Sequence, residues 1–145
     1  MFLTTRGNSA EAVSLHREIL DTKIRIMGPE HPKVLSSMNG LGLALSAEED
    51  FENAIAVLQE LDTLAGKFYP DTHRVRHVYR RHYGACLLKA GKISEAEKIL
   101  ILAYQGLSDT LGESHDNTLE VAQHLVDLYE SQGDPVNAAK YRLED

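Results

Sequence analysis

The sequence predicts an all-α protein made of antiparallel helix hairpins stacked side by side. The first observation is an alanine that recurs every 42 residues, each time after Glu or Asn, at Ala12, Ala54, Ala96 and Ala138. The second is an apolar spacing of three and four residues within each copy, which is helical and leaves no alternating strand pattern. The third is glycine or proline at most of the points where two helices would meet. Because a hairpin of about 40 residues cannot bury enough apolar surface alone, the copies must stack.

The first helix is expected at about 8–27, and it corresponds to the second helix of a hairpin because it carries the first alanine of the series. The segment Gly28–Pro32 ends it, since proline lacks an amide donor and disfavours α geometry in the residue before it. The next copy follows as helices at about 33–47 and 51–67. The first helix therefore has no preceding partner, and we expect the chain to be a piece of a longer array.

The two remaining copies repeat this plan and bring the expected total to seven helices. Tyr69–Pro70–Asp71 and Gly112–Glu113–Ser114 separate them, and the final helix is shorter than its counterparts. The chain is expected to form one domain, 1–145. Its remaining helices are expected at about 72–90, 94–111, 115–131 and 135–144, and its units at 8–27, 33–67, 72–111 and 115–145.

Small residues at repeated positions indicate how the helices pack and turn. The alanines are expected where two helices approach to about 8–10 Å, and Gly42 and Gly84 are expected to allow a similar close approach. Gly91 and Gly133, with Gly7 in the first copy, precede the alanine segments, where a residue tolerant of positive φ is needed. Each copy is therefore two helices joined by a tight turn.

Polar residues in the connectors are candidates for helix caps. Asp71 or Thr72 could accept a hydrogen bond from the first amides of the following helix, as Ser114 could in the next copy. His31, His73 and His115 recur once per copy, and we expect structural roles at the connectors for them. Equivalent positions in stacked hairpins lie about 10–20 Å apart, so these histidines cannot share one metal ion.

The order of residues in the second unit resembles the tetratricopeptide repeat. The residues that carry the likeness are Leu41-Gly42, Leu45, Ala54, Leu58 and Leu61. The step of 42 residues and the connectors at 28–32 and 111–115 resemble the longer repeats of kinesin light chains and of many bacterial proteins. The resemblance runs from about Asn8 to Arg142. It implies a right-handed superhelical stack whose function is to bind other proteins.

Three residues depart from the family pattern. Arg80 occupies a position that is usually bulky and apolar, Val126 replaces the small residue found at Gly42 and Gly84, and Pro135 replaces Phe51 and Ile93. These changes are compatible with the fold but make the local packing harder to predict.

Composition and charge exclude several classes of protein. With 43% hydrophobic and 26% charged residues, the chain is typical of a soluble globular protein, and it has no apolar run long enough for a signal sequence or a membrane helix. A net charge of −7 disfavours general nucleic-acid binding. A single cysteine, Cys86, requires no oxidising compartment, so a cytoplasmic location is expected.

No set of residues indicates catalysis or a cofactor. His73 and His77 have the spacing of a zinc-binding pair on a helix but lack a third ligand. Cys86 follows Ala85 and precedes Leu87 on an expected helix, which favours a small core residue over a nucleophile. Gly40-Leu41-Gly42 lies inside a helix without a preceding strand, so it is no phosphate-binding loop. We expect a non-enzymatic chain without metal or cofactor.

The resemblance implies that the first helix of each pair lines the concave surface where partners bind. Asn39 matches the asparagine that kinesin light chain repeats place there. The expected partner-binding residues are Ser36, Asn39, Leu43 and Ser46 in the second unit; Val78, Arg81, Ala85, Leu88 and Lys89 in the third; and Glu120, Gln123, Asp127 and Glu130 in the fourth. We call these residues the polar stripe.

Charge along the stripe suggests the kind of partner. No acid lies between Asp71 and Glu95, a segment with six Arg and Lys residues, whereas the rest of the chain is acidic. The hypothesis is that an acidic segment of a protein crosses the stripe, with Arg81 for directional hydrogen bonds and with Asn39 and Gln123 for backbone contacts. The alternative interpretation of the charge run is a solvated face without a ligand.

Three other functions stay open at this stage. The chain could be an assembly or spacer module that self-associates through its terminal helices, or a regulatory repeat segment of a bacterial signalling protein. Nucleic-acid binding through the basic third unit would show a steep dependence on salt. No membrane partner is expected.

Overall fold

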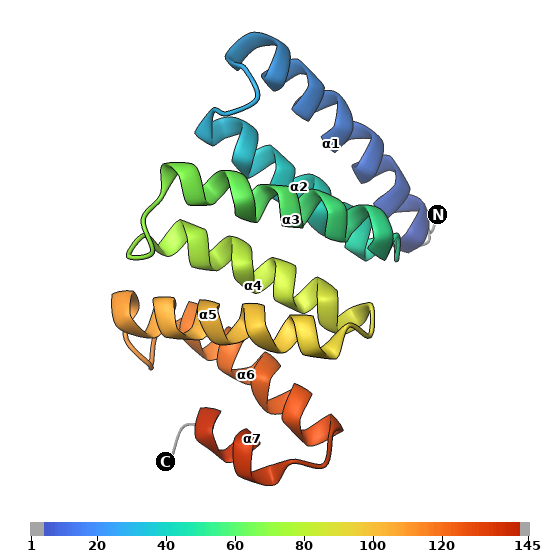
Figure 1. Cartoon of the computed structure of the whole chain (residues 1–145). Coiled ribbons are helices and arrows are strands. Elements are labelled where there is room, and N and C mark those ends of the chain that lie inside the picture. The colour runs from blue at the N-terminus through green and yellow to red at the C-terminus, as the bar shows by residue number, and fades with distance from the viewer. Residues whose placement is uncertain (1–4, 143–145) are drawn as a thin grey trace. The chain divides into compact units, whose positions relative to one another are not determined.

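The computed structural model describes the backbone of residues 5–142 and the side chains from residue 10 to residue 142. Within this range the chain forms seven helices and no strand, as the repeat pattern predicts (Figure 1). Their bounds are α1 (Thr5–Met27), α2 (Pro32–Ala47), α3 (Phe51–Phe68), α4 (Arg74–Lys89), α5 (Ile93–Leu111), α6 (Asp116–Ser131) and α7 (Pro135–Tyr141). The chain divides into two compact units, Met1–Phe68 and Tyr69–Asp145, which we call unit 1 and unit 2.

Unit 1 is a layer of three helices in which α2 packs against both α1 and α3 (Figure 1). Its core is built from leucines at helical spacing, and Leu35, Leu58 and Leu61 have less than 2% of their surface exposed. Gly42 lies against Leu58 so closely that a Cβ atom at Gly42 would overlap the leucine side chain. Ala54 is completely buried. The expected close-packing roles of Gly42 and Ala54 are therefore confirmed.

Unit 2 contains the hairpins α4–α5 and α6–α7, and α6 packs against both α5 and α4. Leu87, Leu100 and Leu107 are fully buried between these helices, and Cys86, at 2% exposed, is a core residue as expected. Gly84 lies against Leu100 as Gly42 lies against Leu58. The two units thus use the same glycine and leucine contact at equivalent positions.

The turns inside the hairpins depend on one residue in the left-handed region. Gly91 and Gly133 adopt φ of 80° and 68°, which confirms the expectation for these two glycines. In the α2–α3 turn the equivalent residue is Glu49, with φ of 66°. The expectation was wrong for Gly7, because α1 begins at Thr5 and Gly7 lies inside that helix.

Histidines, not the residues expected from the connectors, cap the first helix of each pair. His31, His73 and His115 are the N-cap residues of α2, α4 and α6, and each accepts a hydrogen bond at Nδ1 from the amide two residues later, at 3.0, 3.2 and 3.1 Å. Asp71, Thr72 and Ser114 lie too early in the chain for this position, so predicting them as caps was wrong. The structural role expected for the recurring histidines is confirmed.

Candidate functional site

The polar stripe of unit 2 runs along α4 and α6. On α6 its members Glu120, Gln123, Asp127 and Glu130 are exposed, while on α4 Lys89 is the one exposed member. The other α4 members are half-buried, namely Val78, Arg81, Ala85 and Leu88. The accessible part of this stripe is therefore more acidic than the sequence alone indicates.

An ion pair joins the two helices across the stripe. The guanidinium of Arg81 on α4 donates to the carboxylate of Glu120 on α6 and lies 2.8 Å from Nε2 of His82. The Arg81 side chain is only 17% exposed, whereas Glu120 is 57% exposed. Because an exposed carboxylate pairs weakly, a carboxylate from a partner could replace Glu120 at Arg81.

Two histidines beside Arg81 are kept neutral by their surroundings. Burial lowers the pKa of His82 to about 4, with smaller contributions from Arg81 and His124. Burial also lowers the pKa of His124; Arg81 and Lys89 act in the same direction and Asp127 opposes them. At neutral pH the positive charge on this part of the stripe therefore comes from Arg81 and Lys89.

Two arginines of the basic segment, Arg76 and Arg80, lie away from the stripe. Arg76 forms an ion pair with Asp71, and the buried Arg80 lies with its Nη1 3.9 Å from the same carboxylate. These residues line a separate cavity of about 330 Å³ between α4 and α5, where the His77 ring lies against Gly106. The structure thus divides the basic run between two faces of unit 2.

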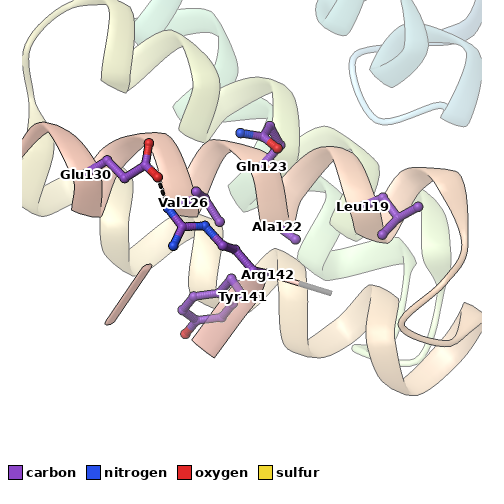
Figure 2. A pocket seen from close by; sticks show the side chains of 7 residues that line it. All are labelled: Leu119, Ala122, Gln123, Val126, Glu130, Tyr141 and Arg142. Atoms are coloured by element: carbon purple, nitrogen blue, oxygen red, sulfur yellow. Dashed lines mark ion pairs between the residues drawn. The ribbon is translucent and has the colours of Figure 1, made fainter. Parts of the chain in front are cut away.

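A surface cavity of about 490 Å³ opens beside the stripe, between α6 and α7 (Figure 2). Leu119, Ala122 and Val126 give it an apolar floor on α6, and Tyr141 forms a wall. At its edge Glu130 and Arg142 form an ion pair, and the stripe residue Gln123 also lines it. An apolar side chain could be buried here next to polar groups that bind a backbone.

The cavity arises where the last hairpin departs from the repeat. In the first two hairpins a glycine contacts a leucine, Gly42 with Leu58 and Gly84 with Leu100. The equivalent residues of the last copy are Val126 and Arg142. Val126 has a side chain where Gly42 and Gly84 have none. In addition, α7 ends at Tyr141, one residue before Arg142. The sequence shows Val126 as a departure, but we did not predict the cavity, Tyr141 or Arg142 as site residues.

The expected stripe residues of unit 1 lie on α2. Ser36 and Leu43 are exposed and Asn39 is half-buried. Ser46 is buried, with 8% of its surface accessible, because it lies at the end of α2 close to the α2–α3 turn. Ser46 is therefore not accessible to a partner in this structure.

His77 is one of the two histidines with the spacing of a zinc-binding pair. His77 is buried, and its Nε2 contacts the backbone carbonyl of Asp71 instead of facing a metal partner. From residue 10 to residue 142, no group of three His, Cys, Asp or Glu residues is placed to hold a metal ion. The described helices also include none with the length and hydropathy needed to cross a membrane.

Comparison with known proteins supports the repeat assignment. Residues 1–61 match the family model described as tetratricopeptide repeat. A search of curated proteins found no match. The fold is similar to a crystal structure of nearly identical TPR-like repeats of a proposed kinesin light chain from Podosopora anserina, with a TM-score of 0.86 and 22% identity, and equally to a glutamine-to-methionine variant of those repeats. The match covers 93% of this chain and 64% of the other chain.

Proposed function

We propose that this chain, which has the fold of a tetratricopeptide-repeat stack, binds a segment of another protein along the polar stripe of unit 2. Tetratricopeptide repeats generally mediate protein–protein interactions, and such scaffolds are generally non-enzymatic. The observation that carries the proposal is the cavity between α6 and α7, which places an apolar floor next to Gln123 and Glu130 of the stripe. Apolar anchoring beside polar orienting groups is the usual composition of a binding site.

The proposed partner carries an apolar residue and, further along the segment, an acidic residue. The apolar side chain enters the cavity over Ala122 and Val126, and the carboxylate binds Lys89 and Arg81 on α4. The Nε2 amide of Gln123 donates to Asp127 at 2.8 Å, which holds the Gln123 side chain on the exposed face. Its carbonyl oxygen is then oriented to accept a hydrogen bond from the backbone of the partner.

A peptide panel tests this proposal. Fluorescein-labelled peptides that combine one Leu with Glu residues at different spacings are titrated with the protein, and anisotropy is measured at low and moderate salt. Lys89→Glu should weaken the best binder about fivefold or more, because it replaces an attraction by a repulsion. The matched control is Lys98→Glu, because Lys98 is also an exposed lysine but lies on α5, outside the stripe.

A second pair of variants tests the cavity. Ala122→Leu fills it and should weaken binding about tenfold or more, since one lost apolar anchor accounts for roughly 1–3 kcal/mol. Circular dichroism checks that the helices remain. If the Lys89 and Ala122 variants both bind the selected peptide as the unsubstituted chain does, the proposed site is wrong.

A further inference from the structure

The open face of α1 carries a continuous apolar stripe. Leu15, Ile19 and Ile26 are 56%, 37% and 72% exposed, and the exposed Thr22 lies between them. Among the described elements, α1 packs only against α2, and it does so with a different face. The hydroxyl of Thr22 accepts a hydrogen bond from Arg25 at 3.5 Å, so the one polar residue in this apolar stripe of α1 has a partner.

The spacing of this stripe is that of a coiled-coil seam. The steps from Leu15 to Ile19, Thr22 and Ile26 are four, three and four residues, which allows only one heptad register. Ile19 and Ile26 then occupy the a positions, and Leu15 and Thr22 occupy the d positions. In parallel coiled coils, β-branched residues at a with leucine at d favour two strands, and this seam has isoleucine at both a positions and leucine at one of its two d positions.

The charges that flank the seam fit a second copy in the same orientation. Glu18 falls at a g position and Lys23 at the following e position, on opposite edges of the seam, and both line the shallow apolar groove formed by the stripe. In a parallel pair, position g of one helix faces the next e position of its partner. Glu18 of each copy would therefore meet Lys23 of the other copy, twice in one dimer.

We propose that a second copy of this chain docks on α1, so that the two α1 helices form a parallel two-stranded contact along Leu15, Ile19, Thr22 and Ile26. This surface belongs to unit 1 and is separate from the peptide site proposed in unit 2. The dimer would therefore present two such peptide sites, and each proposal can fail without the other.

The first test is the molecular mass of the full chain, measured by sedimentation velocity over a series of protein concentrations. A monomer–dimer equilibrium is expected, and Ile26→Gln should raise the dissociation constant about tenfold or more. The matched control is Val136→Gln on α7, because Val136 is also 72% exposed. A chain that remains monomeric at every concentration would overturn the proposal, as would equal effects of the two variants.

The second test uses the flanking charges to establish the orientation. Glu18→Lys alone and Lys23→Glu alone should each weaken the dimer about threefold or more, and the double variant should restore it. Residues five apart do not face each other on one helix, so restoration reports a contact between copies. In an antiparallel pair Glu18 would face Arg25 instead, and the double variant would stay weak. That outcome would overturn the parallel arrangement.

Discussion

Histidine serves as the N-cap of the first helix in three hairpins. In each case the ring Nδ1 accepts a hydrogen bond from a backbone amide that would otherwise lack a partner at the start of the helix. The three residues are His31, His73 and His115. This capping uses the neutral ring, whose unprotonated nitrogen is the acceptor. One side chain per repeat thus marks the start of a helix and explains why a histidine recurs every 42 residues.

Removing one of these caps should have a local cost. We expect His115→Ala to lower the free energy of unfolding by about 1 kcal/mol, because the amide of Asn117 loses its acceptor. Asparagine is a strong N-cap, so His115→Asn should remain close to the unsubstituted chain. Urea unfolding of both variants gives the comparison. Equal losses in the two variants would argue against capping as the role of the ring.

Glu49 carries a conformational strain that the other copies avoid. It adopts φ of 66° where the later repeats have Gly91 and Gly133, and a residue with a Cβ pays about 1–2 kcal/mol there. Glycine would remove this strain, but it also raises the conformational entropy of the unfolded chain, which offsets part of the gain in stability. Glu49→Gly should therefore stabilise the chain by about 0.5–1 kcal/mol in urea unfolding. The control Glu60→Gly, within α3, should cost about 1 kcal/mol.

His82 should make stability depend on pH in the mildly acidic range. Its pKa is about 4 in the folded chain, compared with about 6.5 when unfolded. Between these values the unfolded state binds the proton and the folded state does not, so stability should fall as pH decreases from about 6.5 to 4. His82→Gln should flatten this part of the curve of unfolding free energy against pH. An unchanged slope would contradict the lowered pKa.

At the scale of helices, one glycine sets how closely the members of a hairpin approach. A Cβ atom at Gly84 would lie 2.6 Å from Cδ2 and Cγ of Leu100. Gly42 and Leu58 repeat this contact in unit 1, whereas Val126 and Arg142 occupy the equivalent positions of the last copy. Two hairpins therefore share this close contact, and the third lacks it. The hairpin that lacks this contact is the one that contains the cavity of Figure 2.

Gly84→Ala should destabilise the chain although alanine is the better helix former. The overlap with Leu100 should cost about 1–3 kcal/mol, which outweighs the gain in helix propensity of up to about 1 kcal/mol. Leu100→Ala creates a cavity and should cost about 2–5 kcal/mol alone. Combined, the two changes should cost clearly less than their sum, because the new methyl group occupies part of the space. Additive losses in a double-mutant cycle would show that the contact does not limit the approach.

At the scale of the whole molecule, each helix depends mainly on its neighbours in the chain order. Within unit 1 the contacts join α1 to α2 and α2 to α3, and within unit 2 they join α4 to α5, α5 to α6, and α6 to α7 and α4. Stability in such arrays approximates a sum of repeat and nearest-neighbour contributions. A defect should therefore spread over short distances along the chain.

Hydrogen exchange measured by mass spectrometry tests this local dependence. Leu58→Ala removes a fully buried side chain of α3 and should lower amide protection in α2 and α3 while leaving α6 nearly unchanged. Leu125→Ala is the matched variant in α6 and should lower protection in α5, α6 and α7. Equal loss of protection across all helices in either variant would indicate one cooperative unit instead.

Much of the fold was predictable because the repeat makes local and tertiary requirements coincide. The alanine and glycine columns correctly predicted close packing at Ala54 and Gly42, and the helix bounds agree within three residues. The caps were harder to predict because asparagine, aspartate and serine are the usual candidates, and the histidine ring is an uncommon acceptor there. That the residues of the polar stripe form a binding site stays a prediction.

The sequence by itself determined the helices, their order and the positions where they approach closely, because spacing and residue size are properties of the chain. Only the tertiary structure decided which charged side chains are paired within the chain and which are available to a partner. Arg81 and Glu120 lie 39 residues apart and pair across α4 and α6, and Asp71 engages Arg76. The cavity beside α7 likewise needs residues of α6 to meet Tyr141 and Arg142 in space. Ion pairs and cavities depend on separations in space, which residue spacing along one chain does not specify.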